Sequence, residues 1–241
     1  MEKGIVAGIG EVLWDVLPEG KKIGGAPANF AYHMSQFGFE SYVVSAVGND
    51  VLGDEILENF AEKNLKGFIA KVNFPTGTVQ VGLDADGIPQ YDIKENVAWD
   101  NIPFTPELEM LAGRTGALCF GSLAQRNSVS RDTVRRFVAA MPKDSYKVFD
   151  INLRQNFYSK EVLLESMDIC DILKINDEEL VTVSGLLGYK DESAGDSFTA
   201  TFVASVLKGR SVHEAHQLAV EVSAFVCTQN GAMPVLPEKY R

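Results

Sequence analysis

The sequence predicts an α/β fold in which a central, mostly parallel sheet is flanked by helices. Short apolar runs alternate with segments of helical periodicity, which is typical of strands joined by crossover helices. The chain has 241 residues, 46% of them hydrophobic, and can bury one substantial core. No internal repeat or low-complexity linker divides it, so a single domain over residues 1–241 is expected.

Five apolar runs are the predicted strands, and each is expected to lead into a helix. In chain order they are residues 5–9, 42–47, 117–120, 147–151 and 172–175. Two helix starts carry capping residues. Asp50 precedes apolar residues at helical spacing, and Ser211 with Glu214 forms a capping-box pattern.

One stretch departs from the alternation of strands and helices. Residues 78–83 and 90–93 flank a glycine-containing turn at 84–89, which predicts a β-hairpin without a helix of its own. An ordinary hairpin at the sheet edge is one interpretation of this pattern.

Composition limits the partners and the location. The formal net charge of −11 disfavours nucleic-acid binding. No apolar stretch approaches the ~18 residues of a membrane span, and no signal sequence is recognisable, so no membrane partner is expected. Cys119, Cys170 and Cys227 lie in or beside apolar runs. An odd number of such cysteines favours core thiols in a reducing, cytoplasmic environment.

The most informative motif covers residues 193–204, where small residues open a long apolar helix with Asp196 in its first turn. The free N–H groups and the dipole of a helix start favour a bound phosphate. A carboxylate beside phosphate makes sense if it accepts a proton from a hydroxyl that attacks phosphorus. Taken alone, the motif favours the simpler interpretation that Asp196 stabilises its own helix.

A second glycine-containing motif lies near the amino terminus. Gly24 and Gly25 predict a tight turn that leads into a helix, with Pro27 suited to its first turn. The backbone can then approach a ligand closely. Upstream, Asp15 stands among apolar neighbours, where a carboxylate needs partners, and sugar hydroxyls would serve.

Together the two motifs resemble the ribokinase/PfkB family of carbohydrate kinases, whose paired signatures are Gly-Gly-x-x-x-Asn and Gly-Ala-Gly-Asp. Within the family the chain looks most like a fructokinase, and the resemblance covers nearly its whole length. The phrases that carry the narrower match are residues 10–18, 24–29, 96–102 and 150–154.

The resemblance implies a ribokinase-like fold and an ATP-dependent kinase for the primary hydroxyl of a free sugar. Fructose is the expected substrate, with ribokinase or 2-keto-3-deoxygluconate kinase activity as alternatives. A small β lid from about 11–18 and 77–103 would cover the sugar and form a homodimer contact. ATP and Mg²⁺ are the implied cofactors, and a requirement for a monovalent cation such as K⁺ is left open.

The resemblance also assigns roles to single residues. Asp196 would be the base, and the backbone at Ala194 and Gly195 would stabilise the transferring phosphoryl group. The sugar would be bound by Asp15, Gly24, Gly25, Asn29 and Arg154. The nucleotide would be bound by Asn176, Glu179, Asn230 and Gly231, with Glu179 also reaching magnesium through water.

Some of these residues have a competing structural interpretation. Asp150, Asn152 and Arg154 alternate after a predicted strand, so an extended backbone would place them on one face and Arg154 could pair with Asp150. Asn176 and Glu179 have the spacing of a capping box.

The sequence departs from the family pattern near residues 188–193. Glu179 and Asp196 are separated by 17 positions, whereas the family places several dozen residues there, including a strand that contacts nucleotide phosphates. A true deletion would give a sugar-binding protein or pseudokinase. Alternatively, the printed sequence lacks residues of the native chain. The intact pattern of the downstream helix favours the second explanation.

Overall fold

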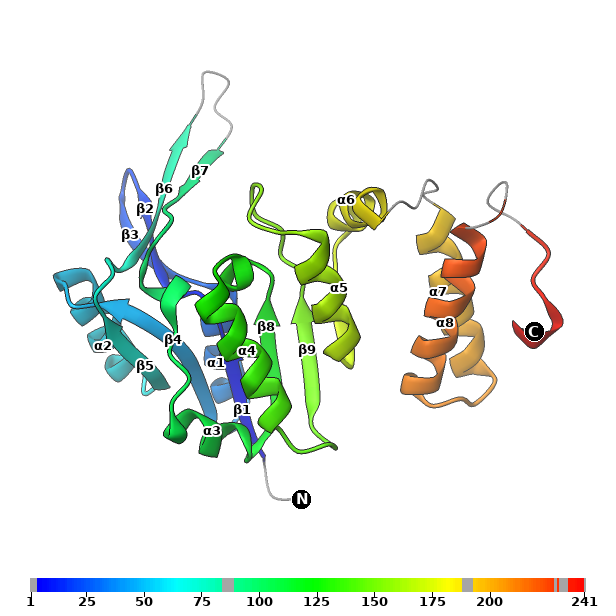
Figure 1. Ribbon diagram of the computed structural model, residues 1–241, viewed down its shortest axis with the longest axis horizontal. Coiled ribbons are helices and arrows are strands. Elements are labelled where there is room, and N and C mark those ends of the chain that lie inside the picture. Colours follow the sequence, from blue (N-terminus) through cyan, green and yellow to red (C-terminus); the bar gives the residue numbers. More distant parts are fainter. Residues whose placement is uncertain (1–3, 84–88, 188–192, 228, 230–233, 241) are drawn as a thin grey trace. The chain divides into compact units, whose positions relative to one another are not determined.

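The computed structural model describes residues 4–83, 89–187, 193–227, 229 and 234–240. The chain divides into two compact units, Met1–Lys174 and Ile175–Arg241. The described strands all belong to the first unit, and the second is helical (Figure 1). The expectation of one domain over 1–241 stays a prediction.

The Met1–Lys174 unit is built on a six-stranded sheet in the order β10-β9-β8-β1-β4-β5. Every neighbouring pair in it is parallel. The predicted α/β class is therefore confirmed. The strands are β1 (Ile5–Ile9), β4 (Ser41–Gly48), β5 (Lys66–Val72), β8 (Thr115–Gly121), β9 (Tyr146–Asp150) and β10 (Ile172–Lys174).

The five predicted strands are present with small shifts at their ends, but β5 was not predicted. It lies at the sheet edge, where Lys66 and Lys71 interrupt its apolar pattern. The expected helix directly after β1 is also wrong. The chain instead enters a second sheet, and a helix forms only at Ala26.

Successive strands of the chain are added first on one side of β1 and then on the other. This reversal decides which face of the sheet each connecting helix covers. From β1 the chain steps through α1 (Ala26–Gln36) to β4, and from β8 it steps the opposite way through α4 (Ser128–Ala140) to β9. Right-handed crossovers in opposite directions place helices on opposite faces. Figure 1 shows α4 and α5 together on one face. The remaining helices are α2 (Val51–Glu62), α3 (Pro106–Ala112) and α5 (Lys160–Ile169).

A separate four-stranded sheet has the order β3-β2-β6-β7. Its outer pairs are antiparallel and its central pair, β2 with β6, is parallel. Figure 1 shows it rising beyond the carboxyl ends of the six-stranded sheet. The strands are β2 (Leu13–Leu17), β3 (Gly20–Gly24), β6 (Gly77–Leu83) and β7 (Pro89–Ile93).

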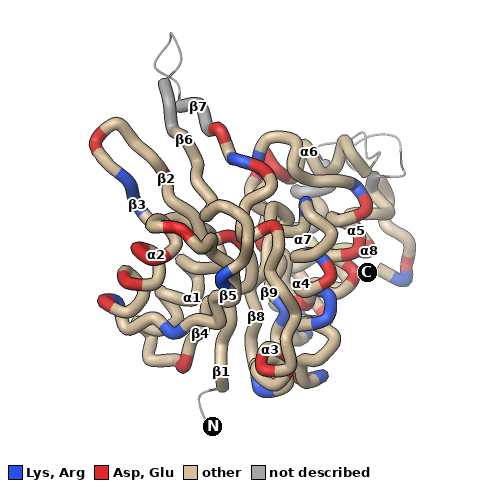
Figure 2. The backbone as a smooth tube through the Cα atoms, turned by 60° about the vertical axis from the view of Figure 1, so that its left-hand side comes forward, with Lys and Arg blue, Asp and Glu red and all other residues tan. Residues whose placement is uncertain are grey.

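This small sheet confirms the predicted hairpin and places it outside the main sheet. Two corrections apply to its expected extent. The polar strand β3 belongs to it, and it ends at Ile93, because Ala98–Asn101 forms a 3-10 turn, η1. Figure 2 shows basic residues on β3 and acidic residues on α2. Lys21 of β3 pairs with Glu55 of α2 and so ties the two elements together.

Asp50 caps α2, as predicted, and its carboxylate accepts the N–H of Gly53 at 2.8 Å. The same carboxylate accepts both the N–H and the hydroxyl of Thr76, at 2.8 and 2.6 Å. The start of α2 is thereby joined to the residue that precedes β6.

The Ile175–Arg241 unit contains α6 (Asp177–Leu187), α7 (Ser193–Leu207), α8 (Val212–Cys227) and the 3-10 turn η3 (Glu238–Tyr240). Helices α7 and α8 pack against each other. The predicted capping box is confirmed: Ser211 N–H donates to Glu214 at 2.9 Å, and Glu214 N–H donates back to Ser211 Oγ at 3.3 Å. Of the helices described, none has the length and apolarity needed to cross a membrane.

Candidate functional site

The chain leaves β1 at the point where the strand order reverses, between β1 and β8. Gly10 has a φ of 149°, and a Cβ on it would lie 2.8 Å from Cγ of Pro27. The start of α1 therefore sits directly over the end of β1. Ligands of open α/β sheets bind in the crevice at such a reversal, so this edge is where a ligand site is expected.

Two glycines let the strand β3 turn closely into α1. Gly25 is the N-cap of α1 with a φ of 118°, and a Cβ on it would lie 2.2 Å from the Glu11 carbonyl oxygen. A Cβ on Gly24 would lie 2.4 Å from Oδ2 of Asp15. Asp15 and Gly24, two of the predicted site residues, are thus in direct contact.

Asp15 lies on the face of β2 that also carries Leu13, because side chains alternate along a strand. Leu13 packs in an apolar cluster with Trp99 and Leu123. Burial raises the pKa of the Asp15 carboxyl above its usual value, and the positive charge of Arg154 opposes this rise.

The segment around Arg154 differs from the prediction. Strand β9 ends at Asp150, and Asn152 and Gln155 have φ values of 43° and 48°. The chain is not extended there, so the predicted common face of Asp150, Asn152 and Arg154 does not form. Asp150 pairs instead with Lys174, at 2.8 Å.

Asp150 pairs with Lys174 rather than with Arg154 because of the register of the sheet. Lys174 and Asp150 are opposite each other in the parallel pair β10–β9. The predicted ion pair between Arg154 and Asp150 is therefore wrong. Arg154 is exposed, and its Nη1 donates to the Leu153 carbonyl oxygen at 2.9 Å.

Asn29 lies in the first turn of α1. Its N–H donates to the Gly25 carbonyl oxygen at 3.0 Å, which is the first hydrogen bond of the helix. The Asn29 side chain is exposed at the start of the helix that Gly25 caps.

Glu11 is a site residue that the sequence analysis missed. It is 3% exposed, and its Oε1 accepts the N–H of Ala26 at 3.2 Å. Its Oε2 is buried without a hydrogen-bond partner among the described residues. Burial raises the pKa of this carboxyl to about 7. The sequence signal was an acidic residue two positions after a strand that is apolar on both faces.

In the Ile175–Arg241 unit, Asn176 and Glu179 cap α6 reciprocally. Asn176 N–H donates to Glu179 Oε2 at 3.0 Å, and Glu179 N–H donates to Asn176 Oδ1 at 2.8 Å. Glu179 is 7% exposed. The capping interpretation is therefore confirmed. In the described part of the chain, no three His, Cys, Asp or Glu side chains gather as a metal site.

Ala194, Gly195 and Asp196 lie in the first turn of α7, which begins at Ser193. This agrees with the predicted helix start, and the side chains there lie outside what the structure describes. Asn230 and Gly231 also lie outside the described residues. The structure thus gathers Asp15, Gly24, Gly25 and Arg154 in one unit and the phosphate-region residues in the other.

A doubly wound parallel sheet with a small second sheet at its carboxyl edge is the architecture of ribokinase-like sugar kinases. The chain belongs to the PfkB family of carbohydrate kinases, whose family model matches residues 16–193 and 192–239. The family expectation is therefore confirmed.

Similar proteins include sugar kinases from archaea and plants. A sugar kinase of Pyrococcus horikoshii is 30% identical over 197 residues, covering 74% of this chain and 63% of that protein. A structure of this same Pyrococcus protein in complex with ATP has a TM-score of 0.66 and 27% identity, covering 95% of this chain and 93% of that chain. Fructokinase-2 of Solanum lycopersicum is 23% identical over 309 residues, covering 97% of this chain and 93% of that protein.

The alignment with the Solanum protein is longer than this chain itself. The 309 aligned positions of the Solanum protein exceed the 241 residues here by 68. The two stretches matched by the family model meet at residues 192–193. This junction falls within 188–193, where the sequence departs from the family pattern.

Proposed function

We propose that the protein is an ATP-dependent sugar kinase that phosphorylates the primary hydroxyl of a free sugar, with fructose as the preferred substrate. The observation that carries the proposal is the match to the carbohydrate kinase family over both units of the chain. The preference for fructose rests on the fructokinase-like phrases around Asp15, Gly24 and Trp99. Fructokinases are also among the similar proteins.

The sugar is proposed to bind beside Asp15 and the Gly24–Gly25 turn. Sugar hydroxyls satisfy the half-buried Asp15 carboxylate, and the absence of side chains at Gly24 and Gly25 lets backbone groups reach the ligand. Asn29 and Arg154 supply an exposed amide and a guanidinium at the same edge. The small sheet acts as a lid that excludes water, a competing acceptor for the phosphoryl group.

In the proposed reaction, the sugar hydroxyl oxygen attacks the γ-phosphorus of ATP. The bond between that phosphorus and its bridging oxygen breaks, and ADP leaves. Asp196 accepts the hydroxyl proton, and the N–H groups at Ala194 and Gly195 stabilise the transferring phosphoryl charge. The start of α7 at Ser193 supports this assignment, because helix amino termini favour anions.

Magnesium, when bound, neutralises phosphate charge. Hard oxygen ligands suit it, and one carboxylate in the first turn of α6, that of Glu179, would be enough if it acted through water. We assign Glu179 to the metal through a water molecule, and Asn176, Asn230 and Gly231 to the nucleotide. A homodimer formed through the small sheet, a cytoplasmic location and a K⁺ requirement are further parts of the proposal.

Sugar binding without catalysis is the second candidate function. Its specific support is the short separation of Glu179 and Asp196, which leaves out the family's phosphate-contacting strand. An intact mass of the protein from its native source distinguishes a true deletion from residues missing in the printed sequence.

The test is ADP release with ATP and Mg²⁺ over fructose, ribose, 2-keto-3-deoxygluconate and adenosine. Asp196→Asn is compared with wild type and with Asp132→Asn, an exposed aspartate of α4. Fructose-dependent turnover that falls at least about a hundredfold in Asp196→Asn alone supports the proposal. Turnover with another sugar changes the substrate. Sugar binding without ADP release, in a chain of verified mass, favours the second candidate.

A further inference from the structure

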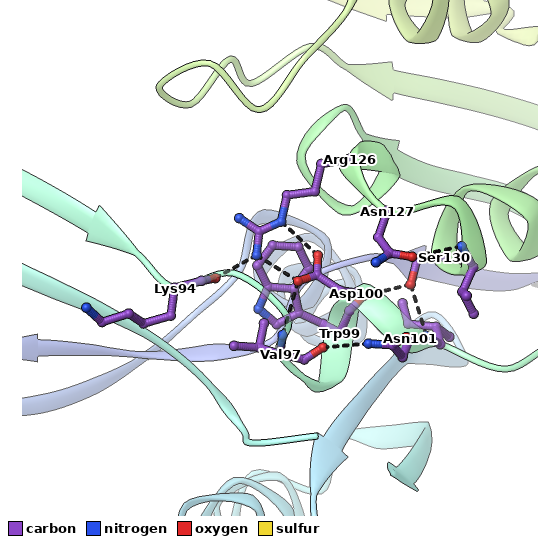
Figure 3. Close-up of polar contacts among 10 residues, drawn as sticks. Lys94, Val97, Trp99, Asp100, Asn101, Arg126, Asn127 and Ser130 are labelled. Atoms are coloured by element: carbon purple, nitrogen blue, oxygen red, sulfur yellow. Dashed lines mark hydrogen bonds and ion pairs between the residues drawn. The ribbon is translucent and has the colours of Figure 1, made fainter. Parts of the chain in front are cut away.

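Arg126 is held by a dense set of contacts outside the residues assigned above. It ends the 3-10 turn η2 (Leu123–Arg126), which follows β8. Its Nε and Nη2 donate to the two oxygens of Asp100 at 2.7 and 2.8 Å, and Nη2 also donates to the Lys94 carbonyl oxygen at 2.6 Å (Figure 3). The side chains of Arg126 and Asp100 are only 7% and 2% exposed.

The guanidinium also contacts two aromatic rings. Its Cζ lies 4.1 Å from the centre of the Trp99 ring and 4.4 Å from that of Phe157. Figure 3 shows the Trp99 ring beside the guanidinium. A planar, weakly hydrated guanidinium can contact rings while its edge forms a bidentate ion pair, and an ammonium cannot do both.

Trp99 connects this cluster to the strand that carries Asp15. A Cβ on Gly77 would lie 2.3 Å from Nε1 of Trp99, so the indole packs directly on the first residue of β6. Gly77 is opposite Leu13 in the parallel pair β2–β6. Asp15 follows two residues later on the same face of β2.

Phe157 connects the cluster to Arg154 on the other side. The N–H of Phe157 donates to the Arg154 carbonyl oxygen at 3.0 Å. Arg126 also binds the carbonyl oxygen of Lys94, which directly follows β7. The backbone N–H of Lys94 donates to the Thr78 carbonyl oxygen at 3.3 Å. Arg126 thus contacts the base of the small sheet, the turn η1 and the segment of Arg154.

We infer that Arg126 is a positioning residue that sets Arg154 and the small sheet relative to Asp15, and thereby sets sugar affinity. This inference rests on the proposed function. Arg126 acts through its neighbours, because the rings it contacts lead to the strand of Asp15 on one side and to Arg154 on the other. Loss of the guanidinium removes its hydrogen bonds to Asp100 and to the Lys94 carbonyl oxygen. The Arg154 segment and the residue after β7 can then shift independently.

The test compares Arg126→Lys with Arg136→Lys. Arg136 is a matched control, because its Cζ lies 4.2 Å from the Phe104 ring and it pairs with Asp132 at 3.7 Å, but its side chain is 55% exposed. We expect Arg126→Lys to raise the KM for the sugar at least tenfold while the KM for ATP and kcat change less than threefold. Sugar-independent ATP hydrolysis should rise relative to sugar-dependent turnover. Arg136→Lys should change none of these.

If Arg126→Lys does not fold, Phe157→Leu tests the same inference. It removes one of the two aromatic rings that contact Arg126 and leaves the ion pair between Arg126 and Asp100. It should raise the same KM, by a smaller factor. A wild-type KM for the sugar in the folded Arg126 or Phe157 variant overturns the inference, since a purely stabilising role would lower the melting temperature alone. If wild type neither phosphorylates nor binds any sugar, the proposed function fails first and the inference falls with it.

Discussion

The carboxylate of Asp15 occupies the space in which a side chain at position 24 would have to lie. An ideal Cβ on Gly24 would be 2.4 Å from Oδ2 of Asp15 and 3.1 Å from Cδ1 of Leu13. This contact explains why β3 ends in glycine where it passes β2, and it makes Gly24 a direct probe of the Asp15 position.

Gly24→Ala should weaken sugar binding without unfolding the protein. The added methyl displaces the Asp15 carboxylate, so the KM for the sugar should rise about tenfold or more, equivalent to roughly 1.4 kcal/mol. Gly185→Ala is the control, because nothing lies within 4 Å of its Cβ position in α6. Steady-state kinetics measure both variants. An unchanged KM in Gly24→Ala would show that Asp15 does not contact the sugar.

Glu11 should make stability depend on pH. Its carboxyl has a pKa of about 7 in the folded protein, raised by burial from 4.5. The folded state therefore holds this proton more tightly than the unfolded state does. The contribution is fully present below pH 4.5 and is lost as pH rises through about 7, a change of roughly 3 kcal/mol.

Urea unfolding of wild type and Glu11→Gln between pH 4.5 and 8 measures this effect. Glutamine keeps an acceptor for the Ala26 N–H but does not titrate. The wild-type unfolding free energy should fall relative to that of the variant as pH rises. Parallel curves across this range would mean that Glu11 is not the group responsible.

Two substitutions in the capping box of α6 distinguish the capping role of Glu179 from its proposed role at the metal. Asn176→Ala removes the acceptor for the Glu179 N–H and should lower the unfolding free energy by about 1 kcal/mol. Glu179→Gln retains a capping side chain but loses the charge. It should leave stability nearly unchanged and raise the Mg²⁺ concentration for half-maximal activity several-fold. If only stability changes in Glu179→Gln, its role is confined to capping.

Cys119 should resist alkylation while the protein is folded. Burial raises the pKa of its thiol to about 12, and the pKa of the half-buried Cys170 thiol to about 11. Because the thiolate is the reactive form, iodoacetamide at pH 8 should label Cys170 before Cys119, and Cys119 should react quickly only in urea. Peptide mass spectrometry follows both sites, and the reverse order would contradict the described burial.

The features predicted correctly from the sequence depend on short-range chemistry. Asp50 and the pair Ser211 and Glu214 cap helices because their partners lie within three residues. Strand β1 was recognisable because both its faces are apolar. Strand β5 was not, since a sheet edge tolerates Lys66 and Lys71, and β3 was missed because its exposed residues are polar.

Local periodicity and short signatures were enough to predict the α/β class, the carbohydrate kinase family and the positions of the glycine motifs. The folded chain was needed to show that Asp15 fills the space beside Gly24, that Lys174 rather than Arg154 pairs with Asp150, and that Glu11 is buried. It also placed Arg126 against Asp100 and the rings of Trp99 and Phe157. These contacts join residues distant in sequence, and their proximity depends on strand order and register, which local patterns do not encode.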